Sequence, residues 1–162
     1  MNGRAVGRSG AWQAAAPVAI ILAGACMAAA PLLSQSDVKV YHGSERDYVL
    51  HCSGCHSMDG SGHPEFGVPD FRGQVGYFLQ LPEGRAFLMQ VPGLMNAGLP
   101  DDRRAAVTNY VVTTFAGASL PAAFRPYSAE EAKRYAGERP ADIAARRKQL
   151  YERLNNMGYA VK

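Results

Sequence analysis

Five consecutive residues, Cys52-Ser53-Gly54-Cys55-His56, bring together the side chains of this chain that are best suited to hold a metal-containing cofactor. Two thiols separated by two residues can add to the two vinyl groups of haem and form thioether bonds. The imidazole directly after the second thiol is then carried under the iron as a ligand. The pentapeptide therefore predicts one haem c, attached covalently through Cys52 and Cys55, with His56 on the iron.

A C-x-x-C pair has two other common uses, a redox dithiol and half of a zinc site. A redox dithiol usually opens a helix within a βαβ pattern, and no segment of this chain has a strong strand pattern. A zinc site needs further ligands, and no second cysteine pair follows. Cys26 is the third cysteine and lies far upstream, so we expect no disulfide in the mature domain.

Residues 1–36 have the composition of an export segment. They contain Arg4 and Arg8 but no acidic residue, and residues 14–33 carry no charge. This order predicts a signal peptide cleaved before Asp37 and a periplasmic location. Two alternatives stay open: residues 14–33 are just long enough to remain as a membrane anchor, and Cys26 after Ala23-Gly24-Ala25 offers a site for lipidation.

Short helices must position the pentapeptide. Ser44 is the expected N-cap of a helix that runs into Cys52, with Tyr48 and Val49 toward the core. Glycines and prolines predict a loop over residues 57–73, in which Phe66, Val68 and Phe71 can pack on the haem. Further helices are predicted over residues 75–79 and 82–89.

The clearest helical pattern opens at Asp101 and stops at Gly117. Val107, Tyr110, Val111 and Phe115 repeat at helical spacing and form an inward stripe, whereas Arg103 and Arg104 are expected to point outward. The fold class predicted for the whole chain is all-α.

Residues 119–162 form a basic helical extension in this interpretation. Ser128 and Glu131 make a capping box, and a second helix is predicted from Arg139-Pro140 with an apolar face. That face consists of Ile143, Leu150, Tyr151 and Leu154. We expect an amphipathic helical hairpin that either braces the preceding domain or docks on a partner or a membrane surface.

Charge is distributed unevenly along the chain. Residues 37–118 contain 6 Lys and Arg against 9 Asp and Glu, a net charge of −3, whereas residues 119–162 contain 9 against 5, a net charge of +4. This asymmetry favours either oriented docking to a charged partner or pairing of the tail with its own core. Nothing resembles a nucleic-acid-binding module, so no nucleic-acid partner is expected.

Residues 37–118 resemble the class I c-type cytochromes. The segment Y-V-L-H-C-S-G-C-H-S-M-D-G-S-G is similar to the attachment segment of that family. The resemblance implies a cytochrome c-like haem domain over residues 37–118, in which Tyr48 packs near Tyr110. It also identifies residues 67–73 with the family's proline loop, so that the Pro69 carbonyl accepts a hydrogen bond from His56 Nδ1.

The same resemblance implies a methionine as the second axial ligand, in an irregular loop before the last core helix. Met95 occupies that position, although Asn96 follows it where the family often has proline. Met89 and His63 are rival ligands, and an open sixth position is a further alternative.

A haem iron with two strong axial ligands carries single electrons and has no position open for substrate. The resemblance therefore implies a periplasmic electron carrier, and not an enzyme, between redox partners such as a dehydrogenase and an oxidase or reductase. Two alternatives remain. The first is a cytochrome subunit of a membrane or periplasmic dehydrogenase complex, and the second is a haem sensor or catalyst with an open site.

Overall fold

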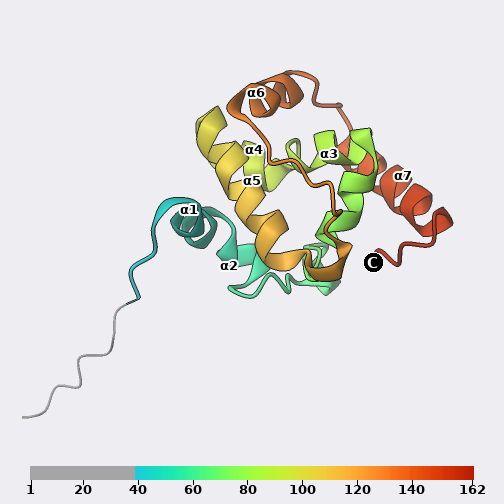
Figure 1. Cartoon of the computed structure of the whole chain (residues 1–162), viewed down its shortest axis with the longest axis horizontal. Coiled ribbons are helices and arrows are strands. Elements are labelled where there is room, and N and C mark those ends of the chain that lie inside the picture. Colours follow the sequence, from blue (N-terminus) through green and yellow to red (C-terminus); the bar gives the residue numbers. More distant parts are fainter. Residues whose placement is uncertain (1–38) are drawn as a thin grey trace, which may run out of the picture. The chain divides into compact units, whose positions relative to one another are not determined.

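The structure, a computed structural model, describes residues 39–162, which form one compact unit (Figure 1). The predictions for residues 1–36, including the cleavage site and the anchor over 14–33, lie outside these residues. The predicted boundary between the haem domain and the helical extension, after residue 118, falls within this compact unit. No helix among residues 39–162 is both long enough and apolar enough to cross a membrane.

The described part of the chain is helical, which confirms the all-α class, and its β-structure is one isolated bridge between His63 and Val68. The α-helices are α1 (Gly43–His51), α2 (Ser53–His56), α3 (Pro82–Leu88), α4 (Pro92–Met95), α5 (Asp101–Phe115), α6 (Ala129–Gly137) and α7 (Ile143–Asn156). Three short 3-10 helices are η1 (Pro64–Phe66), η2 (Val75–Gln80) and η3 (Gly117–Ser119).

Helices α1 and α5 pack against each other, and α1 leads directly into the attachment segment. Tyr48 is buried, and its ring lies 5.6 Å from that of Tyr110 and 5.2 Å from that of Phe115. This confirms the predicted contact between Tyr48 and Tyr110. The carboxylate of Asp47 is also buried and accepts a 2.9 Å hydrogen bond from Arg103 Nε, which lowers the pKa of Asp47.

Two local predictions in these helices were wrong. Helix α1 begins one residue before Ser44, after His42, and no side chain caps it. Arg104 does not point outward, because only 14% of its side chain is exposed where it pairs with Asp101. A guanidinium on a long stem can lie along the protein surface, so helical spacing alone does not determine its exposure.

The segment after the loop consists of short helices that begin at prolines. Pro82 and Pro92 start α3 and α4, where a missing N–H is harmless because the first helical donors have no partner within the helix. Met95 is the last residue of α4, so the irregular loop expected around it is a single helical turn. This short turn connects α3 to the long helix α5.

The extension packs along the rest of the unit. Helix α6 lies on α5, whereas α7 lies on α3 and η2, so the two helices of the expected hairpin rest on different parts of the fold (Figure 1). The capping box of Ser128 and Glu131 is confirmed. Helix α7 begins at Ile143 with Asp142 as its N-cap, and not at Arg139-Pro140. Ile143, Leu150 and Leu154 are buried against Phe78, Leu81 and Phe87.

A buried ion pair joins α6 to α3. Arg85 Nη2 lies 2.9 Å from Glu131 Oε2, and only 14% and 9% of the two side chains are exposed. The Arg85 guanidinium also lies 3.9 Å from the centre of the Tyr127 ring. The hydrogen bonds from Arg85, together with those from Arg125, depress the pKa of Glu131 to about 2.

This depressed pKa predicts an acid-dependent loss of stability. Glu131 is ionised in the folded protein down to about pH 2, so its contribution is complete above its ordinary pKa and is lost as the pH falls from there toward 2. Between pH 6 and pH 3 we expect wild type to lose about 2 kcal/mol more unfolding free energy than Glu131→Gln. Urea titrations at the two pH values measure the difference. Exposed Glu138→Gln is the control, and equal losses in all three proteins would contradict the prediction.

Candidate haem-attachment site

The attachment segment sits at a break between α1 and α2. Cys52 ends α1 and begins α2, and its carbonyl accepts hydrogen bonds from the amides of Cys55 at 3.1 Å and His56 at 2.9 Å. This single turn brings both thiols and the imidazole to one side of the chain, because all three residues line the same cavity. Cys52 and Cys55 form no disulfide with each other.

The residue after His56 has an unusual backbone conformation. Ser57 is the one non-glycine residue with a positive φ in the described part of the chain, at 60°. Its carbonyl accepts a 2.6 Å hydrogen bond from the buried hydroxyl of Tyr48. Because a left-handed backbone is costly for a residue with a Cβ, this bond stabilises the turn that aims His56 into the cavity.

Two groups from the following loop hold the imidazole. His56 Nδ1 lies 3.2 Å from the Pro69 carbonyl oxygen, and the Phe71 ring stacks on the imidazole at 3.9 Å with an interplanar angle of 17°. Burial lowers the pKa of His56, whereas the bond to Pro69 raises it. The expected contact between Pro69 and His56 is therefore present, and it leaves Nε2 as the nitrogen available to a metal.

A cavity of about 320 Å³ opens beside these residues. One wall is the attachment segment with His51, and a second is the loop from Gly67 to Phe71. The opposite walls come from α3, α4 and α5, through mostly aliphatic side chains. These include Phe87, Leu88, Val91, Leu94, Val107, Val111 and Val112. An apolar pocket that presents two thiols and one imidazole fits a flat, apolar macrocycle with one axial ligand.

The extension contributes to the cavity wall, which sequence reasoning did not predict. Arg147 and Tyr151 of α7 line it, as does Val161 near the chain end. The Lys162 amide donates a 2.8 Å hydrogen bond to Gln74 Oε1, and Gln74 is also a cavity residue. A signal for this was available, because Arg147 precedes Tyr151 by four residues and therefore shares a helix face with it.

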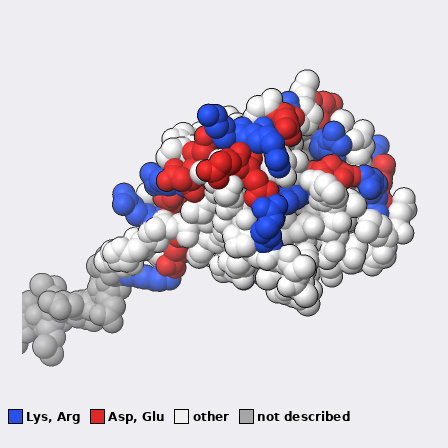
Figure 2. Space-filling view, turned by 45° about the horizontal axis from the view of Figure 1, so that its top comes forward, with Lys and Arg blue, Asp and Glu red and all other residues white. Residues whose placement is uncertain are grey.

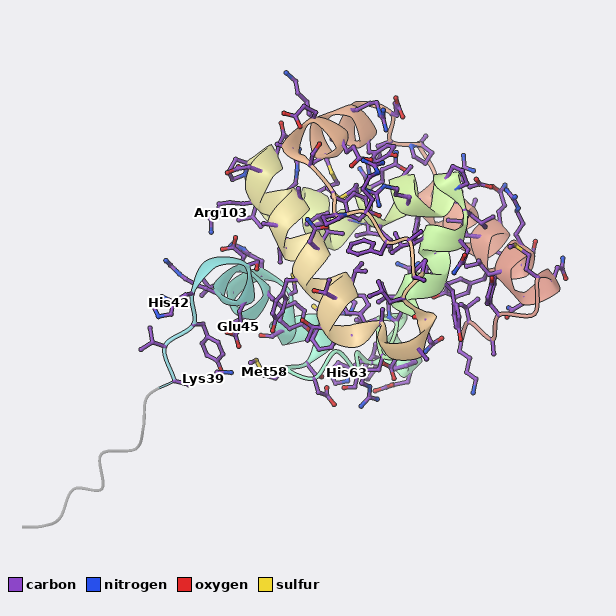
Figure 3. All side chains as sticks on the ribbon, viewed as in Figure 1. Lys39, His42, Glu45, Met58, His63 and Arg103 are labelled. Atoms are coloured by element: carbon purple, nitrogen blue, oxygen red, sulfur yellow. The ribbon has the colours of Figure 1, made fainter. Side chains whose placement is uncertain are left out.

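None of the three candidate distal ligands lines the cavity. Met95 is half-buried beside Gly93 and Leu94, which do line it, and Met89 is buried in the core with Tyr48. His63 is exposed, and Figure 3 shows it with Met58 at the outer edge of the molecule. The structure thus brings together Cys52, Cys55, His56 and Pro69 but leaves Met95 outside the lining.

Two other expectations concern the same site. Val68 and Phe71 face the cavity, but Phe66 is 80% exposed and does not, because η1 and the bridge between His63 and Val68 turn its side chain toward solvent. Within residues 39–162, no cluster of three or more His, Cys, Asp and Glu side chains could hold a metal ion.

Comparison with known proteins agrees with this site. The chain is 31% identical over 139 residues to cytochrome c-552 from one strain of Thermus thermophilus, an alignment that covers 73% of this chain and 88% of that protein. It is 31% identical over 119 residues to another cytochrome c-552 of the same species, covering 61% and 90%. No protein-family model matches the chain. With the helical fold and the cavity beside Cys52, Cys55 and His56, these similarities show that the chain belongs to the c-type cytochromes.

Proposed function

We propose that this c-type cytochrome is a periplasmic carrier of single electrons, with one haem c bonded through Cys52 and Cys55. The observation that carries the proposal is the convergence of both thiols and His56 on one apolar cavity. When bound there, haem supplies a reversible one-electron couple. The protein holds His56 in one orientation through the Pro69 carbonyl and keeps water from the cavity with the side chains of α3 and α5.

Met95 remains our proposed second axial ligand. It is the methionine next to the cavity wall formed by Gly93 and Leu94. Met95 is the last residue of α4, a helix of four residues, and its side chain is half-buried beside that wall. A thioether ligand favours Fe(II) and raises the reduction potential relative to a second imidazole.

One observation favours a second candidate, a haem with an open sixth position that senses or converts a small ligand. No methionine of residues 39–162 lines the cavity, and the wall beside α4 consists of Val91, Pro92, Gly93 and Leu94. None of these residues has a side chain that can ligate iron.

The surface is compatible with charge-steered docking to a redox partner. Figure 2 shows acidic and basic side chains interleaved over one part of the molecule, next to a broad uncharged area. Weak association guided by such charges suits a carrier that must bind and leave its partners. From the resemblance to the c-type cytochromes we propose a dehydrogenase on one side and an oxidase or reductase on the other. Stable co-purification with a dehydrogenase would instead indicate a subunit of a complex.

Spectra and redox titrations of the purified holoprotein test this function, with wild type beside Met95→Ala. We expect haem that stays on the chain after denaturation, a one-electron titration, and a methionine–iron charge-transfer band that Met95→Ala abolishes together with a fall in potential. Met89→Ala is the control, and it should destabilise the fold without removing the band. An unchanged spectrum in Met95→Ala would exclude Met95, and carbon monoxide binding by reduced wild type would support the open site.

A further inference from the structure

The cavity contains one permanently positive side chain, and it comes from the extension. Among the lining residues, Arg147 is the only Lys or Arg. It belongs to α7, which Leu150 and Leu154 anchor in the core on either side of Tyr151. Arg147 is therefore held at the cavity by buried contacts in its own helix.

The positive charge of Arg147 has no carboxylate partner among residues 39–162. Its Nη1 donates to the Gly67 carbonyl at 3.2 Å, and no carboxylate of residues 39–162 forms an ion pair with it. Asp70 also lines the cavity, but its charge is already compensated by Arg72 at 2.8 Å. A guanidinium has five N–H donors, so the bond to Gly67 leaves donors for an anion in the cavity.

Haem brings two propionate carboxylates, which are costly to bury without a partner in a mostly apolar cavity. We propose that Arg147 forms an ion pair with a haem propionate and so raises the reduction potential of the iron. The inference rests on the proposed haem attachment through Cys52 and Cys55. A positive charge beside a propionate offsets its negative charge, which otherwise stabilises Fe(III), and it keeps the propionate ionised.

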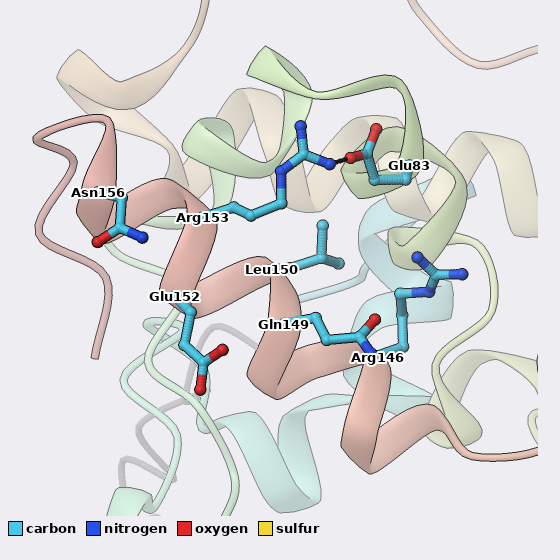
Figure 4. A pocket seen from close by; sticks show the side chains of 7 residues that line it. All are labelled: Glu83, Arg146, Gln149, Leu150, Glu152, Arg153 and Asn156. Atoms are coloured by element: carbon cyan, nitrogen blue, oxygen red, sulfur yellow. Dashed lines mark ion pairs between the residues drawn. The ribbon is translucent and has the colours of Figure 1, made fainter.

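Redox titration of holoprotein variants tests the pairing. Arg147→Gln should favour Fe(III) by roughly tenfold, which is about 59 mV for one electron, whereas Arg147→Lys keeps the charge and should stay near wild type. Arg146→Gln is the matched control. Arg146 is the preceding residue of α7 but lies in a separate surface pocket with Gln149 and Arg153, beside the ion pair between Arg153 and Glu83 (Figure 4).

The pH dependence of the potential separates a propionate pair from a general loss of charge. In wild type the paired propionate stays ionised between pH 5 and 8 and adds no slope to the potential in that range. In Arg147→Gln the pKa of the propionate rises into this window. The propionate binds its proton more tightly when the iron is Fe(II), so the reduction potential should fall as the pH rises from 5 to 8. The other titratable or charged groups that line the cavity are His51, Cys52, Cys55, His56, Asp70, which pairs with Arg72, and Tyr151. All of these groups are present in every variant, so their titration contributes equally to each pH profile and does not affect the difference between variants.

If Arg147→Gln has the same reduction potential as Arg146→Gln, and the same dependence of that potential on pH, the proposed pairing is wrong. If Arg147→Gln does not fold, Arg147→Met keeps the aliphatic stem and removes the charge in the same way. Failure of the proposed haem attachment gives a different result, because wild type itself would then carry no covalent haem.

Discussion

Gly62→Ala should destabilise the holoprotein by about 3 kcal/mol, a sum of left-handed backbone strain and a steric clash. Gly62 has a φ of 63°, and a Cβ built on it would lie 2.4 Å from the Pro69 carbonyl oxygen and 2.7 Å from the Val68 carbonyl oxygen. Both atoms belong to the backbone and cannot rotate away. The loop must therefore move, and the moving atom is the acceptor for His56 Nδ1.

The functional consequence is a rise in the reduction potential. Loss of the bond to Pro69 makes the imidazole less basic, and a less basic ligand stabilises Fe(III) less. Gly73→Ala is the matched control in the same loop, since its φ is 66° but a Cβ there has no neighbour within 4 Å, and Gly73 does not line the cavity. It should cost only about 1 kcal/mol and leave the potential unchanged. Guanidinium titrations followed at the haem absorption band measure the free energy of unfolding, and redox titrations measure the potential. Equal losses of unfolding free energy in the two variants would show that the loop accommodates the methyl group at position 62.

Leu150→Ala should cost about 3 kcal/mol of unfolding free energy, as large-to-small changes in packed cores do. Leu150 is 1% exposed and packs with Phe78, Phe87 and Leu154, so the substitution leaves a hole between the extension and the haem-binding part. Met157→Ala, at the end of the same helix and 50% exposed, is the control and should change stability by less than about 0.5 kcal/mol.

The same substitution should also lower the reduction potential. Helix α7 carries Arg147 and Tyr151 to the cavity wall, so a looser α7 admits water beside the iron. Water stabilises the more highly charged Fe(III) state, which lowers the potential. Thermal unfolding and redox titration of the two variants provide the measurements. A destabilised Leu150→Ala with an unchanged potential would show that the extension supports the fold without controlling access to the haem.

The sequence patterns correctly predicted features that depend on residues close together in the chain. The capping box of Ser128 and Glu131 needs only two side chains three residues apart, and it is present. The stripe on α5 buries Val107 because helical spacing defines a face. Predictions were weakest where a residue's neighbours come from elsewhere in the chain. Phe66 looked like cavity lining, but the short helix η1 turns it outward, and Arg104 lies flat beside Asp101 instead of extending into solvent.

Residue types and spacing were sufficient to predict the helical class, the family, and Cys52, Cys55 and His56 as candidate haem residues, because each depends on a short contiguous motif or a regular period. Only the tertiary structure decided which distant segments enclose the cavity. It placed Arg147 and Tyr151 at the wall and left Met95 outside the lining. These outcomes depend on how helices separated by dozens of residues pack together, and packing is set by contacts that no local pattern contains.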